Sequence, residues 1–143
     1  MAERTEGTTE IEARSEEIVE TITDYESYPE WVDGIRSAEV LERDDRGRGT
    51  RVAFGFSAMG FSAAYTLAYA YEPDRVSWTT VEASGAVRDI RGEYELEPLN
   101  GRTRVTYRLG VDLAVALPAF VKRRADRAAI RTALEGLKRR VEG

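Results

Sequence analysis

Apolar side chains recur with the spacing of a helix near the C-terminal end of the chain. Four aliphatic residues follow one another at intervals of three or four positions: Ile130, Leu134, Leu137 and Val141. This spacing predicts a single apolar helix face. Pro118 suits the first turn of such a helix, because its missing N–H is not needed there. We therefore expect one helix over residues 118–141, about 35 Å long, whose apolar face needs a large partner.

The middle of the chain alternates between apolar and polar positions, which predicts strands. Six strands are expected, over residues 37–43, 50–57, 61–71, 75–81, 87–97 and 103–112. The pair Asn100-Gly101 is a strong hairpin signal between the last two. Because short connections make consecutive strands antiparallel neighbours, we expect a sheet with one face available for a core. The long C-terminal helix is the only predicted element large enough to cover that face.

The N-terminal segment predicts a further strand followed by a short helix. Residues 8–13 have strand character, with Ile11 pointing inward, and Ser15 is a natural N-cap for the helix that follows. The apolar stripe of this helix is Ile18, Ile22 and Tyr25. Pro29 interrupts the pattern and biases the preceding residue away from helix. The expected order is strand, helix, helical turn, six strands and a long helix.

An uncharged stretch over residues 52–71 is as long as a membrane-spanning helix. Its apolar residues, however, recur at every second position, and Ala58-Met59-Gly60 has the character of a turn. We interpret the stretch as a β-hairpin and predict no membrane-spanning segment.

Composition narrows the possible functions. The chain has 143 residues, of which 42% are hydrophobic and 33% are charged, as in a globular protein, and we expect a single domain over residues 1–143. It contains no cysteine and no histidine, which excludes thiol chemistry and histidine-based triads and argues against a zinc or iron site. No glycine-rich phosphate loop and no defensible pair of catalytic carboxylates is found, so we expect no metal and no cofactor. Residues 1–9 do not resemble a signal peptide, which favours a cytoplasmic location.

Charge is distributed unevenly along the chain. Residues 118–143 carry eight Lys or Arg and three Asp or Glu, a net charge of +5, whereas the whole chain carries −5, so the remainder carries −10. A basic helix can bind nucleic acid, anionic lipid or a protein partner, here through the outward residues Arg124, Arg131 and Lys138. Our interpretation is that the helix instead packs on an acidic sheet and the charges balance internally, without a nucleic-acid partner.

The order of elements resembles the helix-grip fold of the START-like superfamily, which includes polyketide cyclase/dehydrase and coenzyme Q-binding branches. The local match is the block from Ile11 to Trp31, in which a strand and a short helix lead into an Asp-aromatic-x-x-aromatic-Pro-x-Trp motif. The matching residues are Asp24, Tyr25, Tyr28, Pro29 and Trp31. The segment from Leu117 to Val141 resembles the closing helix of the family. The chain departs from the family pattern at Glu16, where proline is frequent, and at Val19, where a large aromatic residue is favoured.

The resemblance implies an α+β fold in which a curved antiparallel sheet of about seven strands wraps around the long C-terminal helix, with two short helices after the first strand. It also implies a cavity between sheet and helix, open near the N-terminal half of the helix, that receives a hydrophobic or aromatic small molecule. The superfamily holds lipid carriers, hormone receptors and enzymes, so the fold by itself does not decide the activity.

Alternation places a set of aromatic residues on the inward face of the sheet: Phe54, Phe56, Phe61, Tyr65, Tyr69, Trp78, Tyr94 and Tyr107. Inward tyrosines need partners for their hydroxyl groups. A cavity that holds water or a ligand provides such partners and a dry core does not, so we expect these aromatic residues to bind the ligand. The alternative is that the tyrosines lie at the rim of the sheet with their hydroxyls in solvent.

Four further residues are candidates for polar contacts or for closing the cavity. Arg88 shares its alternation phase with Ile90 and Tyr94, so it is expected to point inward, where it could polarise a ketone, or else to form a salt bridge at the rim. Trp31 lies over the entrance or simply packs against the helical turn.

Arg123 and Arg127 fall on the same helix face as Ile130 and Leu134, and Asp126 lies beside them. They are expected to anchor a ligand carboxylate, phosphate or phenolate at the mouth of the cavity. The alternative is that they pair with acidic residues of the sheet or loops, such as Glu93 or Asp33.

Together these features predict a protein that binds or carries a hydrophobic or aromatic small molecule, such as a lipid, a quinone or a polyketide, in a cavity of about 300 Å³ or more. The alternative is an aromatase/cyclase that uses arginine and tyrosine in the same cavity. We lean against an enzyme, because conventional catalytic groups are missing. A monomer or weak dimer is expected.

Overall fold

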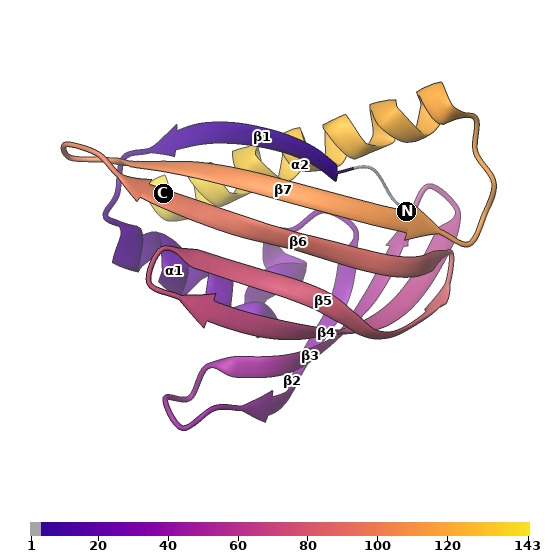
Figure 1. Ribbon diagram of the computed structural model, residues 1–143, viewed down its shortest axis with the longest axis horizontal. Helices are drawn as coiled ribbons and strands as arrows, with labels where there is room; N and C mark the ends of the chain where they lie inside the picture. The colour runs from indigo at the N-terminus through magenta and orange to yellow at the C-terminus, as the bar shows by residue number, and fades with distance from the viewer. Residues whose placement is uncertain (1–3) are drawn as a thin grey trace.

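The computed structural model describes residues 4–143 and consists of one sheet with three helical segments on its concave side (Figure 1). The strands are β1 (Arg4–Ile11), β2 (Ile35–Arg43), β3 (Gly49–Ala58), β4 (Phe61–Glu72), β5 (Arg75–Gly85), β6 (Val87–Pro98) and β7 (Thr103–Leu113). The helices are α1 (Ser15–Thr23), the 3-10 helix η1 (Tyr25–Glu30) and α2 (Ala119–Glu142). The predicted α+β fold and order of elements are confirmed.

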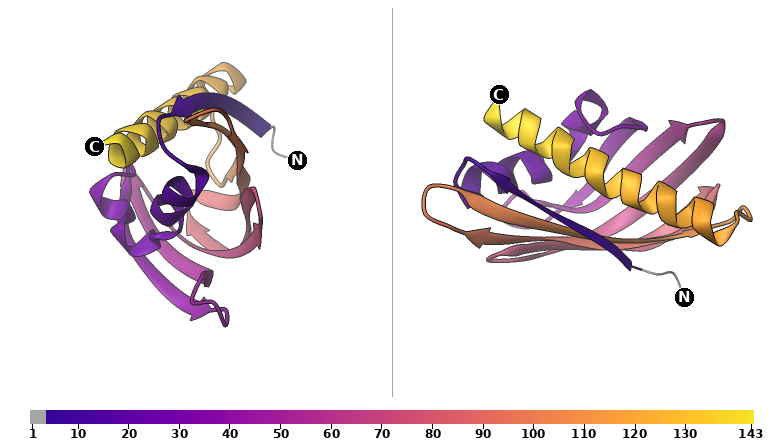
Figure 2. Two further views of the ribbon diagram at one scale, coloured as in Figure 1. Left: turned by 90° about the vertical axis from the view of Figure 1, so that its left-hand side faces the viewer. Right: turned by 90° about the horizontal axis from the view of Figure 1, so that it is seen from above.

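The sheet is antiparallel throughout and has the order β1-β7-β6-β5-β4-β3-β2. Consecutive strands from β2 to β7 are neighbours because each connection between them is short. Figure 2 shows the sheet curving from β2 to β1, with α1, η1 and α2 inside the curve. The first strand therefore returns to pair with the last one, and α2 packs mainly against this β1 edge.

The apolar stripe of α2 fixes how the helix sits on the sheet. Ile130, Leu134 and Leu137 are buried, as the helical spacing predicts. The helix approaches β1 closely at Gly7, where an added Cβ would lie only 2.5 Å from Cγ2 of Ile130. Because a β-carbon cannot be accommodated at that distance, glycine in the strand is what allows α2 to pack against β1 there.

The N-terminal segment differs from its prediction in two respects. The first strand is β1 (Arg4–Ile11), so it begins earlier and ends earlier than the predicted 8–13. Ser15 is not the N-cap of α1. That position is Arg14, which forms no side-chain cap hydrogen bond. The Ser15 hydroxyl lies 3.3 Å from the hydroxyl of Thr103, the first residue of β7, so its polar group is engaged by tertiary structure instead.

The uncharged stretch over residues 52–71 is the hairpin of β3 and β4, as predicted. Its two turn residues, Met59 and Gly60, both have positive φ angles, of 54° and 83°, which is the geometry of the tight turns that match the twist of a hairpin. Within residues 4–143, no helix is long and apolar enough to cross a membrane.

The charges of α2 are not balanced by the sheet, contrary to our interpretation of the sequence. Three of its ion pairs lie within the helix itself: Lys122–Asp126, Arg131–Glu135 and Lys138–Glu142. The paired acidic side chains of the sheet bind arginines of the sheet itself or of the loop before β7. Arg108, for example, binds Glu6, Glu93 and Glu95.

Candidate ligand-binding site

A cavity of about 260 Å³ lies between the concave face of the sheet and α2. Most of its wall comes from the sheet, η1 contributes Tyr28, and α2 contributes only two small residues, Ala129 and Ala133. The volume is slightly below the expected 300 Å³ and corresponds to the liquid volume of about nine water molecules. The cavity therefore fits a small ligand.

Seven of the predicted aromatic residues line this cavity: Phe54, Phe56, Tyr65, Tyr69, Trp78, Tyr94 and Tyr107. Alternation brings them together because they lie on one face of five strands, β3 to β7. Phe61 has the same alternation phase, but it lies at the end of the β3–β4 hairpin, where 41% of it is exposed, and it does not line the cavity.

The deepest part of the wall is a continuous aromatic surface. Tyr94 and Tyr107 are stacked with ring centroids 4.5 Å apart and an interplanar angle of 15°. Trp78 packs against both, at 5.5 and 5.8 Å, and against Tyr69 at 5.8 Å. Gly92 makes room for the indole, because an added Cβ would meet Trp78 at 2.7 Å. This wall offers flat π faces on which a ring-bearing ligand can stack.

Two of the inward tyrosines are satisfied by the protein. Tyr28 donates its hydroxyl hydrogen to the Ile22 carbonyl oxygen at 2.5 Å, at the last turn of α1. The hydroxyl of Tyr25 is 2.7 Å from that of Tyr71, which donates to the Gly49 carbonyl. These hydrogen bonds tie η1 to α1 and to the sheet, so the protein itself holds this side of the cavity in place.

The hydroxyl groups of four other cavity tyrosines form no hydrogen bond within the described part of the chain. These residues are Tyr65, Tyr69, Tyr94 and Tyr107. Their oxygen atoms are not among the fully buried unpartnered atoms of the described residues, so they border the open space of the cavity. Burial raises the pKa of all four hydroxyls, that of Tyr65 to about 12 and those of the others further. They are therefore neutral at physiological pH and remain available to donate or accept hydrogen bonds from a bound molecule.

The cavity wall carries no ionised side chain. Every lining residue is apolar or a tyrosine, and the tyrosines are neutral. A buried charge without a partner is strongly disfavoured, so the part of a ligand that enters this cavity must itself be neutral. Among residues 4–143, no three side chains of the metal-binding types are grouped so that they could hold a metal ion.

The prediction that Arg88 points into the cavity is wrong. The pairing of β6 with β7 shifts register between Val87 and Asp89, so one extra residue is inserted into the alternation. Val87 and Ile90 both line the cavity as a result, and Arg88 is exposed. A β-bulge of this kind reverses the facing of every residue before it.

The prediction that Arg123 and Arg127 point toward the cavity mouth is also wrong. They share a helix face with Ile130 and Leu134 as expected, but that face is turned toward β1. Arg127 lies along the groove between α2 and β1, and Arg123 is exposed.

From α2 the cavity is lined by Ala129 and Ala133, and the half-buried Lys122 and Asp126 precede them on the helix. Lys122 and Asp126 pair with each other at 2.5 Å, with only 23% and 13% of their side chains exposed. Sequence reasoning missed the two alanines. Their i, i+4 spacing on the helix was the available signal, because small residues on one face leave space beside it.

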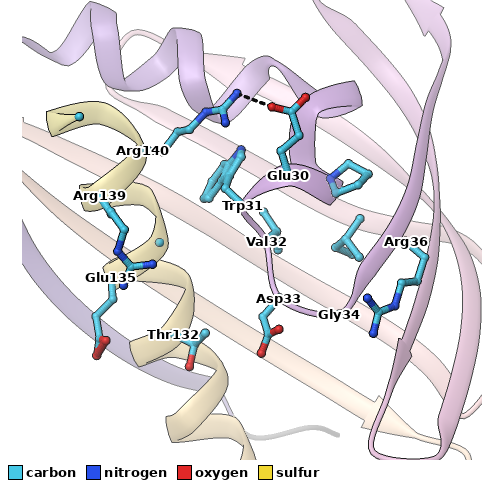
Figure 3. A pocket seen from close by; sticks show the side chains of 14 residues that line it. Glu30, Trp31, Val32, Asp33, Gly34, Arg36, Thr132, Glu135, Arg139 and Arg140 are labelled. Carbon is cyan, nitrogen blue, oxygen red and sulfur yellow. Dashed lines mark ion pairs between the residues drawn. The ribbon is translucent and has the colours of Figure 1, made fainter.

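Trp31 does not lie over the entrance of the cavity. It lines a second, open groove of about 630 Å³ between the segment after η1 and the C-terminal half of α2 (Figure 3). Its ring packs edge-on against Tyr28 at 5.2 Å, and its Nε1 is buried without a hydrogen-bond partner among the described residues. The packing alternative for Trp31 fits this arrangement.

The groove is polar and adjoins the cavity, because Val32 and Ile35 line both. Arg140 is held by Glu30 across the groove at 3.1 Å (Figure 3). Arg36 and Arg139 also line it, are exposed, and form no ion pair within residues 4–143. The site therefore has a neutral aromatic interior and, next to it, a groove of mixed charge, lined by Arg36 and Arg139 and also by the carboxylates of Asp33 and Glu135.

Comparison with known proteins gives a consistent result. Residues 2–142 match the family described as "Polyketide cyclase / dehydrase and lipid transport". A search of curated protein sequences found no relative that matches the chain. Solved structures with the same fold include a START superfamily protein from Mycobacterium smegmatis, with a TM-score of 0.88, 20% identity and 97% of each chain covered.

Two further solved structures represent different activities on this fold. The Zhui aromatase/cyclase from Streptomyces has a TM-score of 0.80 and 16% identity, with 99% of this chain and 94% of the other covered. A STAR-related lipid transfer protein from Xanthomonas axonopodis has a TM-score of 0.76 and 16% identity, with 98% and 86% covered. At these identities the likeness shows the fold and leaves the activity open.

Proposed function

Because the chain belongs to the polyketide cyclase/dehydrase and lipid transport family, we propose that it binds and carries a small, neutral, ring-bearing molecule in the cavity between the sheet and α2. The observation that carries this proposal is the aromatic wall, on which four tyrosine hydroxyls form no hydrogen bond within residues 4–143 and border the open space of the cavity. Flat rings suit the stacked faces of Tyr94 and Tyr107. Oxygen atoms on the ligand would engage the free hydroxyls, which are otherwise left unpaired in an apolar site.

The size and polarity of the cavity define the ligand class more narrowly. A volume of about 260 Å³ accepts roughly one or two fused aromatic rings, or a similar length of aliphatic chain, in line with the lower limit for small-molecule pockets. A longer ligand would extend past Val32 and Ile35 into the polar groove. There Arg36 and Arg139, with Asp33 and Glu135 in the same groove, would favour a strongly polar end, and an anionic one where it contacts the guanidinium groups. Quinone-like, polyketide-like and short lipid molecules share this combination.

The enzyme alternative has less support from the site. An aromatase/cyclase was expected to use Arg88 or Arg123 beside a tyrosine hydroxyl, and both guanidinium groups lie outside the cavity. The remaining candidates for proton transfer are tyrosines whose pKa values burial raises, which makes them poor bases near neutral pH. Binding without chemistry is therefore the function that the arrangement favours.

Two measurements test the proposal. Native mass spectrometry of the freshly purified protein, followed by extraction under denaturing conditions, would reveal a co-purifying neutral molecule and identify its class. Titration with the neutral aromatic dye N-phenyl-1-naphthylamine measures whether the cavity accepts a ring system, and we expect one dye per chain with enhanced fluorescence. A protein that carries no ligand and does not bind the dye would contradict the proposal.

A further inference from the structure

One end of the molecule carries most of its exposed bulky apolar side chains. Within the described residues, seven large apolar side chains are exposed, and five of them belong to the β3–β4 hairpin or to the start of α2 and the loop before it: Met59, Phe61, Leu117, Phe120 and Val121. Met59 is 92% exposed and Phe120 is 61% exposed. Such side chains are costly to leave in water when they gather at one place, so the cluster needs an explanation.

These residues lie at the same end because of the strand order. In the antiparallel sheet, the β3–β4 turn, the β5–β6 turn and the end of β7 lie at the same end of the strands. This end is on the right in Figure 1, next to the start of α2. Two backbone hydrogen bonds join them, from the Ala86 N–H to the Ser62 carbonyl and from the Ala114 N–H to the Ala86 carbonyl, both 2.9 Å. The five apolar side chains thus lie at one end of the molecule, on the hairpin and at the start of α2, and we call them together the apolar rim.

Unpaired positive charge surrounds the apolar rim. Arg88, Arg123 and Arg124 are exposed and form no ion pair within residues 4–143. The first turn of α2 contains no acidic residue. Arg123 and Arg124 follow in the second turn of α2, where their positive charge can attract an anionic partner. The acidic residues nearby on the sheet are Glu82, Asp89 and Asp112, of which Asp89 pairs with Arg91.

The apolar rim also adjoins the ligand cavity. Val87 and Leu113 line the cavity, and the chain continues from them directly into Arg88 and into the loop that contains Leu117. Residues 118–143 carry a net charge of +5, whereas residues 1–117 carry −10. Electrostatic attraction to an anionic surface therefore favours approach through α2, and the apolar side chains are concentrated at the end where α2 begins.

We propose that the apolar rim docks on the surface of an anionic lipid bilayer. Phe120, Met59 and their neighbours insert among the upper acyl chains, while Arg88, Arg123 and Arg124 contact lipid phosphates. The apolar side chains stand on separate prongs, the hairpin and the start of the helix, which suits insertion between lipids. This inference rests on the proposed carrier function in one respect, since docking there gives a ligand a path between the bilayer and the cavity.

Vesicle co-sedimentation tests the proposal on the full chain. The probes are vesicles of phosphatidylcholine and vesicles of equal parts phosphatidylcholine and phosphatidylglycerol, at about 0.05 M and about 0.15 M salt. We expect binding to the anionic vesicles only, weaker at the higher salt concentration. Replacing Arg123 and Arg124 together with glutamine should weaken binding about 25-fold, at roughly fivefold for each charge. Phe120→Ser should weaken it about tenfold through lost apolar burial.

Matched controls come from the opposite end of the sheet. Leu41→Ser changes an apolar side chain that is 49% exposed on β2, and Arg46→Gln removes an exposed arginine in the β2–β3 turn. Neither should alter vesicle binding. Equal losses in these controls, or binding that is insensitive to Phe120→Ser, would overturn the proposal, because either result would indicate non-specific attraction.

The dye titration separates this inference from the proposed function. Phe120, Arg123 and Arg124 do not line the cavity, so their variants should bind N-phenyl-1-naphthylamine as the parent protein does. Dye binding without vesicle binding would overturn the docking proposal alone and point to an acidic protein as the partner of the rim. Vesicle binding without dye binding would overturn the carrier function and leave the docking surface in place.

Discussion

Replacing Ala129 and Ala133 together with leucine should close the cavity from the helix side. Both alanines line it on α2, and the double change adds six carbon atoms. At about 30 Å³ for a group the size of water, these atoms occupy roughly 180 Å³ of the 260 Å³ cavity. A ligand must then overcome packing strain of about 1–3 kcal/mol, which corresponds to a dissociation constant about five to 150 times larger.

The same change should stabilise the fold. Each added methylene gains about 0.8 kcal/mol when it is fully buried, so the upper limit for six is about 5 kcal/mol. Imperfect fit removes part of this gain, and we expect a net increase of about 1–2 kcal/mol in the free energy of unfolding. For a chain of this length that increase raises Tm by roughly 3–6 °C.

The assay is therefore a pair of measurements on one variant, dye titration with N-phenyl-1-naphthylamine and thermal unfolding followed by circular dichroism. The matched control is Ala125→Leu, which makes the same substitution at a position of the same helix that does not line the cavity and should change neither. Unchanged dye affinity would refute the assignment of the cavity as the binding site. Weaker binding together with a lower Tm would indicate a damaged fold and would contradict the packing argument.

Three further predictions follow from the site. Tyr28→Phe should lower the free energy of unfolding, measured in urea, by about 1–3 kcal/mol, because the buried Ile22 carbonyl loses its donor. Tyr65→Phe should lower the free energy of unfolding much less. Equal losses in the two variants would contradict this account. The free energy of unfolding should decline as pH rises above about 10. Burial raises the pKa of Tyr65 to about 12, so above about pH 10 the folded chain holds a proton that the unfolded chain has released. A denaturation midpoint that is equal at about pH 9 and about pH 11 would disprove this prediction. Replacing Arg36 and Arg139 with glutamine should weaken binding of 1-anilinonaphthalene-8-sulfonate about three- to tenfold while leaving its uncharged analogue N-phenyl-1-naphthylamine unaffected, and equal effects on both dyes would exclude the groove as the site of the anionic end.

Much of the architecture could be predicted because the relevant signals are local. Strand alternation and the helical stripe each depend on a period that is fixed by backbone geometry. For this reason the seven inward aromatic residues, from Phe54 to Tyr107, were correctly grouped on one face before any tertiary information was used. The hairpin over residues 52–71 was distinguished from a membrane span by the same periodicity.

The predictions for the charged residues and for Trp31 were wrong where the local period did not determine which way a side chain points. Arg88 turned outward because one residue is inserted into the alternation between Val87 and Asp89. Such a bulge is set by pairing with β7 and leaves no clear mark in the sequence of β6 itself. Trp31 carried the family motif, but whether it faced the cavity or the neighbouring groove depended on how η1 packs against α2.

The sequence by itself determined which elements form, which residues share a face, and that the inner face is rich in tyrosine. Only the tertiary structure decided the rotation of α2 about its axis, which turns the stripe of Arg127 and Ile130 toward β1 and the stripe of Ala129 and Ala133 toward the cavity. A helical period relates residues to one another and not to the sheet. The absolute orientation follows from the close contact at Gly7, a long-range packing constraint that no local pattern contains.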